Sequence, residues 1–223
     1  MTKTPRAFIA CDVHVPYHDP AAVAACVRAA RDFRPDVFVM NGDLLDFEAL
    51  SRFLSNPRTV SEPQAELDEG AKILRRFEAA VGPKCRRVFL QGNHEERLEK
   101  YLTKNAPHLL GLRSLNLSEL LGLQGYTVVP YPQFYKIGSL VVQHGVSYGS
   151  TAVDRNIAKF GGFDCCQGHS HRISQRYVTS LHGTHSSVEG GCLCKLEQPY
   201  SKHNNWQRGW VTYDEKGLHT HIL

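Results

Sequence analysis

The sequence lacks any apolar run that approaches the roughly 18 residues needed to cross a bilayer. Residues 1–6 show neither the apolar core nor the small-residue cleavage site of a secretory signal. A large excess of either charge is also missing, because 26 Lys and Arg stand against 22 Asp and Glu, for a formal net charge of +4. These absences predict a cytoplasmic protein with no membrane partner. The small positive charge favours an anionic partner without establishing nucleic-acid binding.

Cysteine pairing motifs are scarce as well. The chain has seven cysteines, an odd number, and most lie in apolar stretches where a thiol packs as a small hydrophobe, so a disulfide scaffold is not expected. The segment Cys192-Leu193-Cys194 resembles half of a zinc site. No second cysteine pair and no suitably spaced histidine accompanies it in the sequence, so structural thiols are the favoured interpretation.

What the chain does contain is typical of a globular protein: 223 residues, 42% hydrophobic and 22% charged. A chain of this length can bury one sizeable core, which predicts a single domain over residues 1–223. In the first half, short β-rich runs alternate with helical patterns, as in βαβ units around a largely parallel sheet. The expected strands there are residues 8–11, 37–40 and 87–90, and the expected helices are residues 21–33 and 61–80.

The second half has a different pattern, with successive strands separated by turns. The expected strands are residues 126–129, 134–137, 140–143, 163–167, 172–179, 210–213 and 218–222, with a helix at 152–160. A helical insertion is expected at about residues 105–125. Together the two halves predict an α/β fold, a four-layer α/β/β/α sandwich of two mixed sheets flanked by helices.

Five short polar blocks each follow an expected strand. They are Asp12-Val13-His14, Asn41-Gly42-Asp43-Leu44-Leu45-Asp46, Gly92-Asn93-His94-Glu95, Gln143-His144-Gly145 and Gly168-His169-Ser170-His171. Ligands of open α/β sheets bind at the carboxyl ends of strands, so these blocks are expected to converge. Two ligating residues spaced by two positions in an extended segment lie on the same side and can face one ion.

The side chains of these blocks form a mixed set of ligands. Carboxylate, imidazole and one amide oxygen suit Mn, Fe, Zn or Co better than Mg or Ca, and Mn is the expected ion. The candidates exceed what one ion needs once positions for water stay open, which predicts two divalent transition metal ions that share a carboxylate. The candidate ligands are Asp12, His14, Asp43, Asn93, His144, His169 and His171.

With these blocks in this order, the sequence resembles the calcineurin-like metallophosphoesterase superfamily, and its length resembles small bacterial and phage-type members. The resemblance covers Asp12 to His171. It implies that Asp12, His14 and His171 hold a first metal, with Asp43 as the bridging ligand. It implies a second metal held by the three ligands that remain, again with Asp43; these are Asn93, His144 and His169.

The resemblance also assigns catalytic roles to two residues. His94 is implied to donate a proton or contact the phosphate, and Asp46 to orient it. Independently of the family, a water activated by two metal ions can attack phosphorus in line, and a cationic His94 could protonate the leaving alkoxide. Asp46 has a competing interpretation as a helix cap. Glu95 and Glu96 are expected only to form a first helical turn that suits the helix dipole.

The substrate is less well specified than the reaction. The Arg-Gly pair that continues the second block in protein phosphatases is absent, because Phe47 and Glu48 follow Asp46. Candidate substrate contacts are therefore Asn93, His94, Arg97 and Arg172. The favoured function is a phosphodiesterase or nuclease acting on single-stranded nucleic acid or nucleotides.

Two alternatives remain open: a phosphomonoesterase, such as a nucleotide or protein phosphatase, and a non-catalytic binding module on the same fold. The binding module predicts missing ligands or a replaced His94, and neither is seen. Aromatic rings near the site would favour a strand-binding nuclease; the candidates are Tyr17, Tyr148 and Trp206. The other histidines have no expected role, although His18 lies close to the first block; they are His18, His108, His182, His185, His203, His219 and His221.

Overall fold

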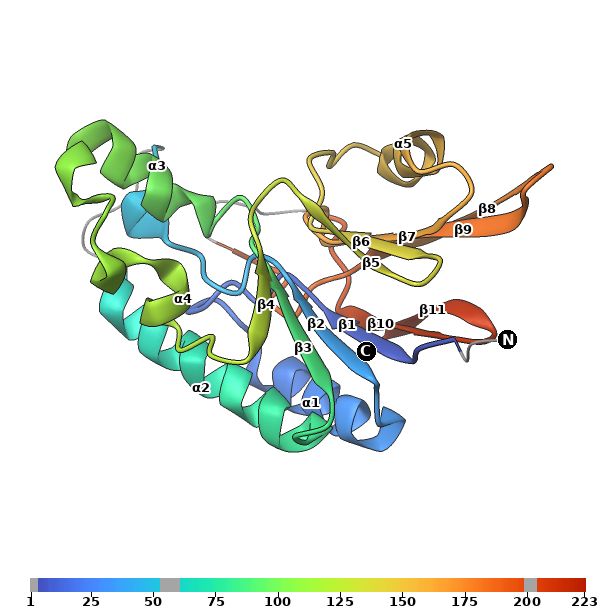
Figure 1. Cartoon of the computed structure of the whole chain (residues 1–223), viewed down its shortest axis with the longest axis horizontal. Helices are drawn as coiled ribbons and strands as arrows, with labels where there is room; N and C mark the ends of the chain where they lie inside the picture. The colour runs from blue at the N-terminus through green and yellow to red at the C-terminus, as the bar shows by residue number, and fades with distance from the viewer. Residues whose placement is uncertain (1–3, 53–60, 199–203) are drawn as a thin grey trace.

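A computed structural model describes residues 4–52, 61–198 and 204–223 (Figure 1). Its centre is a six-stranded sheet with the order β11-β10-β1-β2-β3-β4. The four strands β1 to β4 run parallel, and β10 and β11 add an antiparallel edge. The strands are β1 (Ala7–Ala10), β2 (Val37–Asn41), β3 (Arg86–Leu90), β4 (Tyr126–Val129), β10 (Gly209–Asp214) and β11 (Gly217–Ile222).

A second sheet of five strands, in the order β5-β6-β7-β9-β8, faces the first. Strands β6, β7 and β9 are parallel to one another, and β5 and β8 pair antiparallel at the two edges. The strands are β5 (Phe134–Ile137), β6 (Leu140–Gln143), β7 (Asp164–Gln167), β8 (Ile173–Ser180) and β9 (Gly183–Gly190). Both sheets are therefore mixed.

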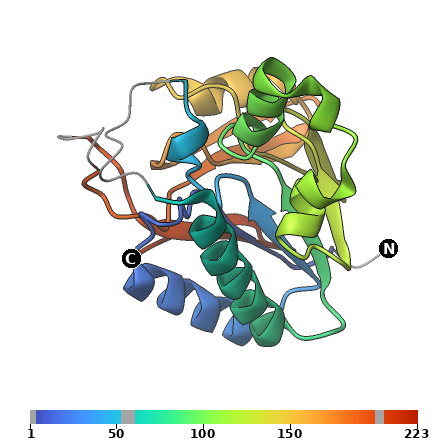
Figure 2. The same ribbon diagram turned by 90° about the vertical axis from the view of Figure 1, so that its left-hand side faces the viewer.

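Helices cover the outer faces of the two sheets. Helices α1 (Pro20–Phe33) and α2 (Pro63–Val81) lie side by side against the first sheet, whereas α5 (Ala152–Lys159) covers the second (Figure 2). The expected four-layer α/β/β/α sandwich is thus confirmed. Helices α3 (Glu96–Asn105) and α4 (Leu117–Leu120) lie at one end of the molecule. Among the described residues, no helix is both long and apolar enough to span a bilayer.

Strand β1 shows how the sequence builds two cores. Its side chains alternate between faces, as strand geometry requires. Phe8 packs with Phe38 and Phe77 in the core under the helices, whereas Ile9 packs with Val142 in the core between the two sheets. A strand buried on both faces is continuously apolar, which is why Ala7–Ala10 carries no polar residue.

Strand β9 was not expected from the sequence. Its residues, Gly-Thr-His-Ser-Ser-Val-Glu-Gly, include two glycines and few of the β-branched or aromatic residues that favour strands. The segment nonetheless lies inside the second sheet, paired with both β7 and β8, and Ser186 to Gly190 are buried. Tertiary pairing therefore overrides a weak local preference.

The segment at residues 105–125 consists mainly of short helical turns. It contains two 3-10 turns, Pro107–Leu109 and Arg113–Leu115, followed by α4. A third 3-10 turn, Glu48–Leu50, follows the second polar block. The single domain expected over residues 1–223 stays a prediction.

Candidate metal centre

All five polar blocks lie where a strand ends, and the fold brings those ends together. Asp12, Asp43 and Asn93 come after β1, β2 and β3 of the first sheet, whereas His144 and His169 come after β6 and β7 of the second. Ligands from the two facing sheets therefore meet in one place, although they are up to 160 residues apart in the chain.

Three of the predicted ligands form a first cluster around Asp12. The Nε2 atom of His171 lies 3.1 Å from Oδ1 of Asp12, and the Nε2 atoms of His14 and His171 are 3.0 Å apart. The His14 Nε2 atom lies 3.6 Å from Oδ2 of Asp43. Two imidazole nitrogens that face each other beside two carboxylates are an arrangement that a shared cation stabilises.

A second cluster forms on the other side of Asp43. The Nε2 atom of His144 lies 3.1 Å from Oδ2 of Asp43 and 3.2 Å from Oδ1 of Asn93. His169 joins Asp43 and His144 in a group whose ligand atoms all lie within 4.8 Å of one another. Because Oδ2 of Asp43 faces both clusters, the donor set fits two divalent ions that share one carboxylate.

Hydrogen bonds at the far side of two imidazoles fix which nitrogen can bind metal. His14 Nδ1 is 3.0 Å from Oδ2 of Asp46, and His144 Nδ1 is 2.9 Å from the backbone oxygen of Asn41. An acceptor at Nδ1 keeps the ring proton there and leaves the Nε2 lone pair free. Once the ring is neutral, each of these histidines is thus held in the tautomer that metal ligation needs.

The backbone of the ligand residues is strained. Asp12, His14, Asp43, His169 and His171 all have positive φ angles, between 51° and 70°. Non-glycine residues in the left-handed region each carry a conformational penalty of order 1 kcal/mol or more, and such residues cluster at functional sites. Five of the seven predicted ligands share this strain, which the surrounding sheets must offset.

Two glycines make room for the ligand carboxylates. A Cβ atom at Gly92 would lie 2.0 Å from Oδ1 of Asp43, and one at Gly168 would lie 2.4 Å from Oδ2 of Asp12. Neither position tolerates a side chain, because each glycine's backbone packs directly against a predicted ligand. Gly92 and Gly168 therefore leave room for the ligand carboxylates, in addition to allowing the chain to turn.

Glu95 has a role that the sequence analysis missed. Its carboxylate is buried and accepts hydrogen bonds from the backbone N–H groups of Asp43 at 2.8 Å, Leu45 at 3.0 Å and Gly92 at 2.7 Å. Burial raises the pKa of Glu95 to about 7, and the Asp43 carboxylate adds to the rise. Glu95 thus ties the second block to the third. The sequence did contain a sign of this role, because the family block that it resembles has an acidic residue at the position of Glu95.

His94 lies beside Asp43 and His14, and its ring centroid is 4.5 Å from that of His14. Its Nδ1 atom is 2.8 Å from the backbone oxygen of Asp46, whereas the Asp46 carboxylate is 3.6 Å away and bonds His14 instead. Burial lowers the pKa of His94 to about 4, so the free protein holds a neutral ring there at pH 7. Asp46 thus contacts His94 through its main-chain oxygen, and its carboxylate also lies within ion-pair distance of the ring.

The two arginines proposed as substrate contacts occupy different surroundings. Arg97 reaches the site, with Nη2 3.0 Å from Nε2 of His94 and Nη1 2.8 Å from the Asp46 backbone oxygen. Arg172 donates to the backbone oxygens of Tyr148 and Gly149, at 2.8 and 2.7 Å, and pairs with Glu189. The structure therefore places Arg97 beside His94 and engages Arg172 in holding a loop.

The imidazole pKa values differ between ligands. Burial disfavours a charged His14, but hydrogen bonds to Asp12 and Asp46 outweigh it and raise the pKa. In the same way Asp43 raises the pKa of His144 to about 9 against the effect of burial. Burial dominates at His169 and His171 and lowers the pKa of both. The neighbouring carboxylates therefore favour the charged ring at His14 and His144, whereas burial favours the neutral ring at His169 and His171.

Two of the three candidate aromatic rings flank the centre. Trp206 lies 4.1 Å from the His171 ring, and Tyr148, which is 73% exposed, lies 5.8 Å from the His169 ring. Tyr17 instead donates its hydroxyl to Glu48. His18 pairs through its backbone with Cys194, and His203 lies outside the described residues.

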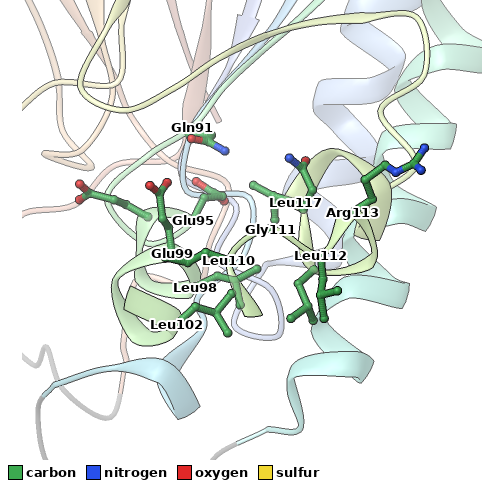
Figure 3. Close-up of a pocket in the computed structure, with 13 residues that line it drawn as sticks. Gln91, Glu95, Leu98, Glu99, Leu102, Leu110, Gly111, Leu112, Arg113 and Leu117 are labelled. Atoms are coloured by element: carbon green, nitrogen blue, oxygen red, sulfur yellow. The ribbon is translucent and has the colours of Figure 1, made fainter. Parts of the chain in front are cut away.

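A separate cavity of about 440 Å³ lies between α3 and the helical turns that follow it (Figure 3). Leu98 and Leu102 of α3 face Leu110 and Leu112 across it. None of the predicted metal ligands is among the described residues that line this cavity, although Glu95 is. Glu95 therefore contacts both this cavity and the backbone of the ligand residue Asp43.

Comparison with known proteins agrees with the resemblance of the blocks. A family model described as calcineurin-like phosphoesterase matches residues 6–173, which includes every predicted ligand. The Gene 54 protein of Mycobacterium phage D29 is 28% identical over 237 residues, covering 96% of this chain and 90% of its own. The Gene 54 protein of Mycobacterium phage L5 is 27% identical over 235 residues, with the same coverage.

Solved structures of low sequence identity match most of the chain. Vps29 of Entamoeba histolytica, in a single-mutant form, has 12% identity and a TM-score of 0.47, and covers 98% of each chain. Vps29 of Chaetomium thermophilum has 12% identity and a TM-score of 0.48, and covers 98% of this chain and 90% of its own.

Proposed function

Because the chain belongs to the calcineurin-like phosphoesterase family, a membership that supports metal-dependent hydrolysis of phosphoesters, we propose that it is a dinuclear phosphodiesterase. Its substrates are nucleic-acid strands or nucleotides. The observation that carries the proposal is the convergence of two ligand clusters on the shared Oδ2 atom of Asp43. Two divalent ions, manganese by donor chemistry, would supply charge stabilisation and activate the attacking water when bound.

The chain's own residues divide the remaining work. Asp12, His14 and His171 would hold the first ion. Asn93, His144 and His169 would hold the second, and Asp43 would be shared by both. Asp46 positions His14 through its carboxylate and His94 through its backbone oxygen. Because Asp46 contacts neither substrate nor metal in this scheme, it is a positioning residue.

Arg97 and His94 form the phosphate-binding side of the site. The guanidinium of Arg97 takes the place of the arginine that is absent after Asp46, and it is held by the Asp46 backbone at 2.8 Å. A phosphate anion beside His94 favours the charged ring and raises its pKa from about 4, which is the direction that a proton donor to the leaving oxygen requires. Asn93 contacts substrate as well as metal.

The flanking rings favour a diester of nucleotides over a simple ester. Tyr148 offers a largely exposed ring beside His169, and Trp206 lies beside His171. Base stacking on aromatic rings contributes about 1–3 kcal/mol per base in strand-binding proteins. One ring beside a ligand of each cluster suits a substrate with more than one nucleotide.

A phosphomonoesterase is the second candidate, and Arg97 favours it. A guanidinium next to His94 can bind the dianion of a terminal phosphate through two parallel hydrogen bonds. A non-catalytic binding module is disfavoured, because all seven ligand positions and His94 keep the residue types that hydrolysis needs. A cytoplasmic location accompanies both catalytic proposals.

The test compares four substrates on one preparation. Chelator-stripped protein, reloaded with Mn²⁺, is assayed side by side on a bis-aryl phosphate, an aryl phosphate, a cyclic nucleotide and single-stranded DNA. A diesterase hydrolyses the bis-aryl phosphate and DNA faster than the aryl phosphate. His144→Ala abolishes the activity, whereas His182→Ala, at an exposed turn, leaves it intact. Activity in His144→Ala, or without metal, contradicts the proposal.

A further inference from the structure

The segment Cys192-Leu193-Cys194 acquires a histidine partner through the fold. The Sγ atom of Cys194 lies 3.9 Å from Nδ1 of His171, and the ligand atoms of Cys192, Cys194 and His171 all lie within 4.8 Å of one another. All three side chains are buried. His171 is 21 residues before Cys192, which is why spacing in the sequence did not connect them.

The distances suit a small thiophilic ion. Zinc bonds of about 2.3 Å to sulfur and about 2.0 Å to nitrogen place tetrahedral ligand atoms roughly 3.6–3.8 Å apart. The observed separation of 3.9 Å between Cys194 Sγ and His171 Nδ1 is close to this value. The three atoms therefore need little movement to hold one ion.

A buried amide lies beside the thiols. Gln198 is 2% exposed and lies within hydrogen-bonding reach of the Cys194 sulfur, where an amide N–H can donate to a thiolate. The Cys192 segment is fixed in place, because Leu193 N–H donates to the Asp12 backbone oxygen at 2.9 Å.

His171 uses a different nitrogen in the dinuclear centre. Its Nε2 atom faces Asp12 Oδ1 at 3.1 Å and His14 Nε2 at 3.0 Å, whereas Nδ1 faces the thiols. A neutral imidazole has one nitrogen lone pair and one N–H group. If Nδ1 binds an ion, the proton stays on Nε2 and is donated to Asp12, which forms a carboxylate–histidine–metal arrangement.

We propose that Cys192, Cys194 and Nδ1 of His171 form a site for a soft divalent ion such as Zn²⁺ or Cd²⁺. Binding deprotonates both thiols, so the ion gains two sulfur bonds and one nitrogen bond while two protons go to solvent. Because His171 has one lone pair to offer, this site excludes the first ion of the dinuclear centre. A thiophilic ion therefore inhibits the protein by withdrawing one ligand from the reaction site.

Cadmium alone is the probe. Metal-free, reduced protein is titrated with Cd²⁺ while sulfur-to-cadmium charge-transfer absorption is recorded in the ultraviolet. The wild type develops the band with one equivalent. The Cys192→Ser variant loses the part of the band intensity that one thiolate contributes. The double variant, Cys192→Ser with Cys194→Ser, loses the whole band. Cys85→Ser, a buried cysteine at the start of β3, is the matched control and keeps it.

Two results overturn the site: no band in the wild type, or an undiminished band in the double variant. Because either variant could fail to fold, X-ray absorption at the cadmium edge of the wild type provides a second measurement, and an absence of sulfur neighbours also overturns the site. Neither readout uses substrate, so failure here is distinct from failure of the proposed phosphodiesterase.

Protein preloaded with two Mn²⁺ tests whether an ion at the cysteine site excludes the first ion of the dinuclear centre. One equivalent of Cd²⁺ releases one Mn²⁺ in parallel with the growth of the charge-transfer band, as measured by electron paramagnetic resonance of free Mn²⁺. A wild-type band with both Mn²⁺ ions retained contradicts the exclusion.

Discussion

The two ligand clusters differ in how deeply they are buried. Asp12, His14 and His171 of the first cluster are at most 6% exposed, whereas Asn93 and His169 of the second are only half-buried. His94, proposed to contact phosphate, lies beside the shared Asp43 and beside His14, and Arg97 contacts His94. In the proposed centre, the first ion would therefore be enclosed mainly by protein, and the second would lie nearer to solvent and substrate.

Asp43→Asn is expected to disrupt both clusters, because the Oδ2 atom of Asp43 faces both of them. Loss of the bridging charge should cost several kcal/mol of transition-state stabilisation, or roughly 1000-fold in kcat/KM. Steady-state hydrolysis and metal counting by isothermal titration check it. Asp68→Asn, on the exposed side of α2, is the control and should change neither.

Asp46→Asn should affect the first cluster selectively. The variant keeps the shape but removes the charge that supports His14 at 3.0 Å, so affinity for the first ion should fall by about 10–100-fold. Titration with Mn²⁺ resolves the two ions. Equal weakening of both would mean that the clusters are not supported independently.

Glu95→Gln should weaken both clusters together. The amide replaces one acceptor oxygen by a donor, which leaves backbone N–H groups at Asp43, Leu45 or Gly92 unpaired, and one such group costs about 1–3 kcal/mol. Chemical denaturation measures the loss in the metal-free protein. Glu99→Gln, on the exposed side of α3, is the matched control, and equal stability of the two variants would refute the proposed tie.

The smallest expected effect is the release of histidine protons when metal binds. The pKa of His144, raised to about 9, favours its charged ring at pH 7, and the pKa of His14 is shifted in the same direction, so a bound ion must displace a ring proton. Metal affinity should therefore rise with pH up to about 9 and fall below it. Calorimetry in buffers of different ionisation enthalpy counts the released protons. His144→Ala should release one fewer, and an unchanged number would contradict the assignment.

Most of the layer order followed from local patterns. Continuously apolar strands such as Ala7–Ala10 and Val37–Asn41 report burial on both faces, and both were expected within one residue of their bounds. Strand β9 was missed because Ser, His and Gly carry no strand signal, and only its pairing with β7 and β8 makes it extended. Its neighbours supplied the stability that its composition lacks.

Side-chain roles followed the same division. The sequence by itself determined the chemical types of the ligands, their order along the chain and their place after strands, because these are local properties of short blocks. Only the tertiary structure decided which groups support them: Asp46 turns its carboxylate to His14 and its backbone to His94, and Glu95 joins two blocks. It alone brought His171 to Cys194, because such contacts depend on how two sheets pack face to face.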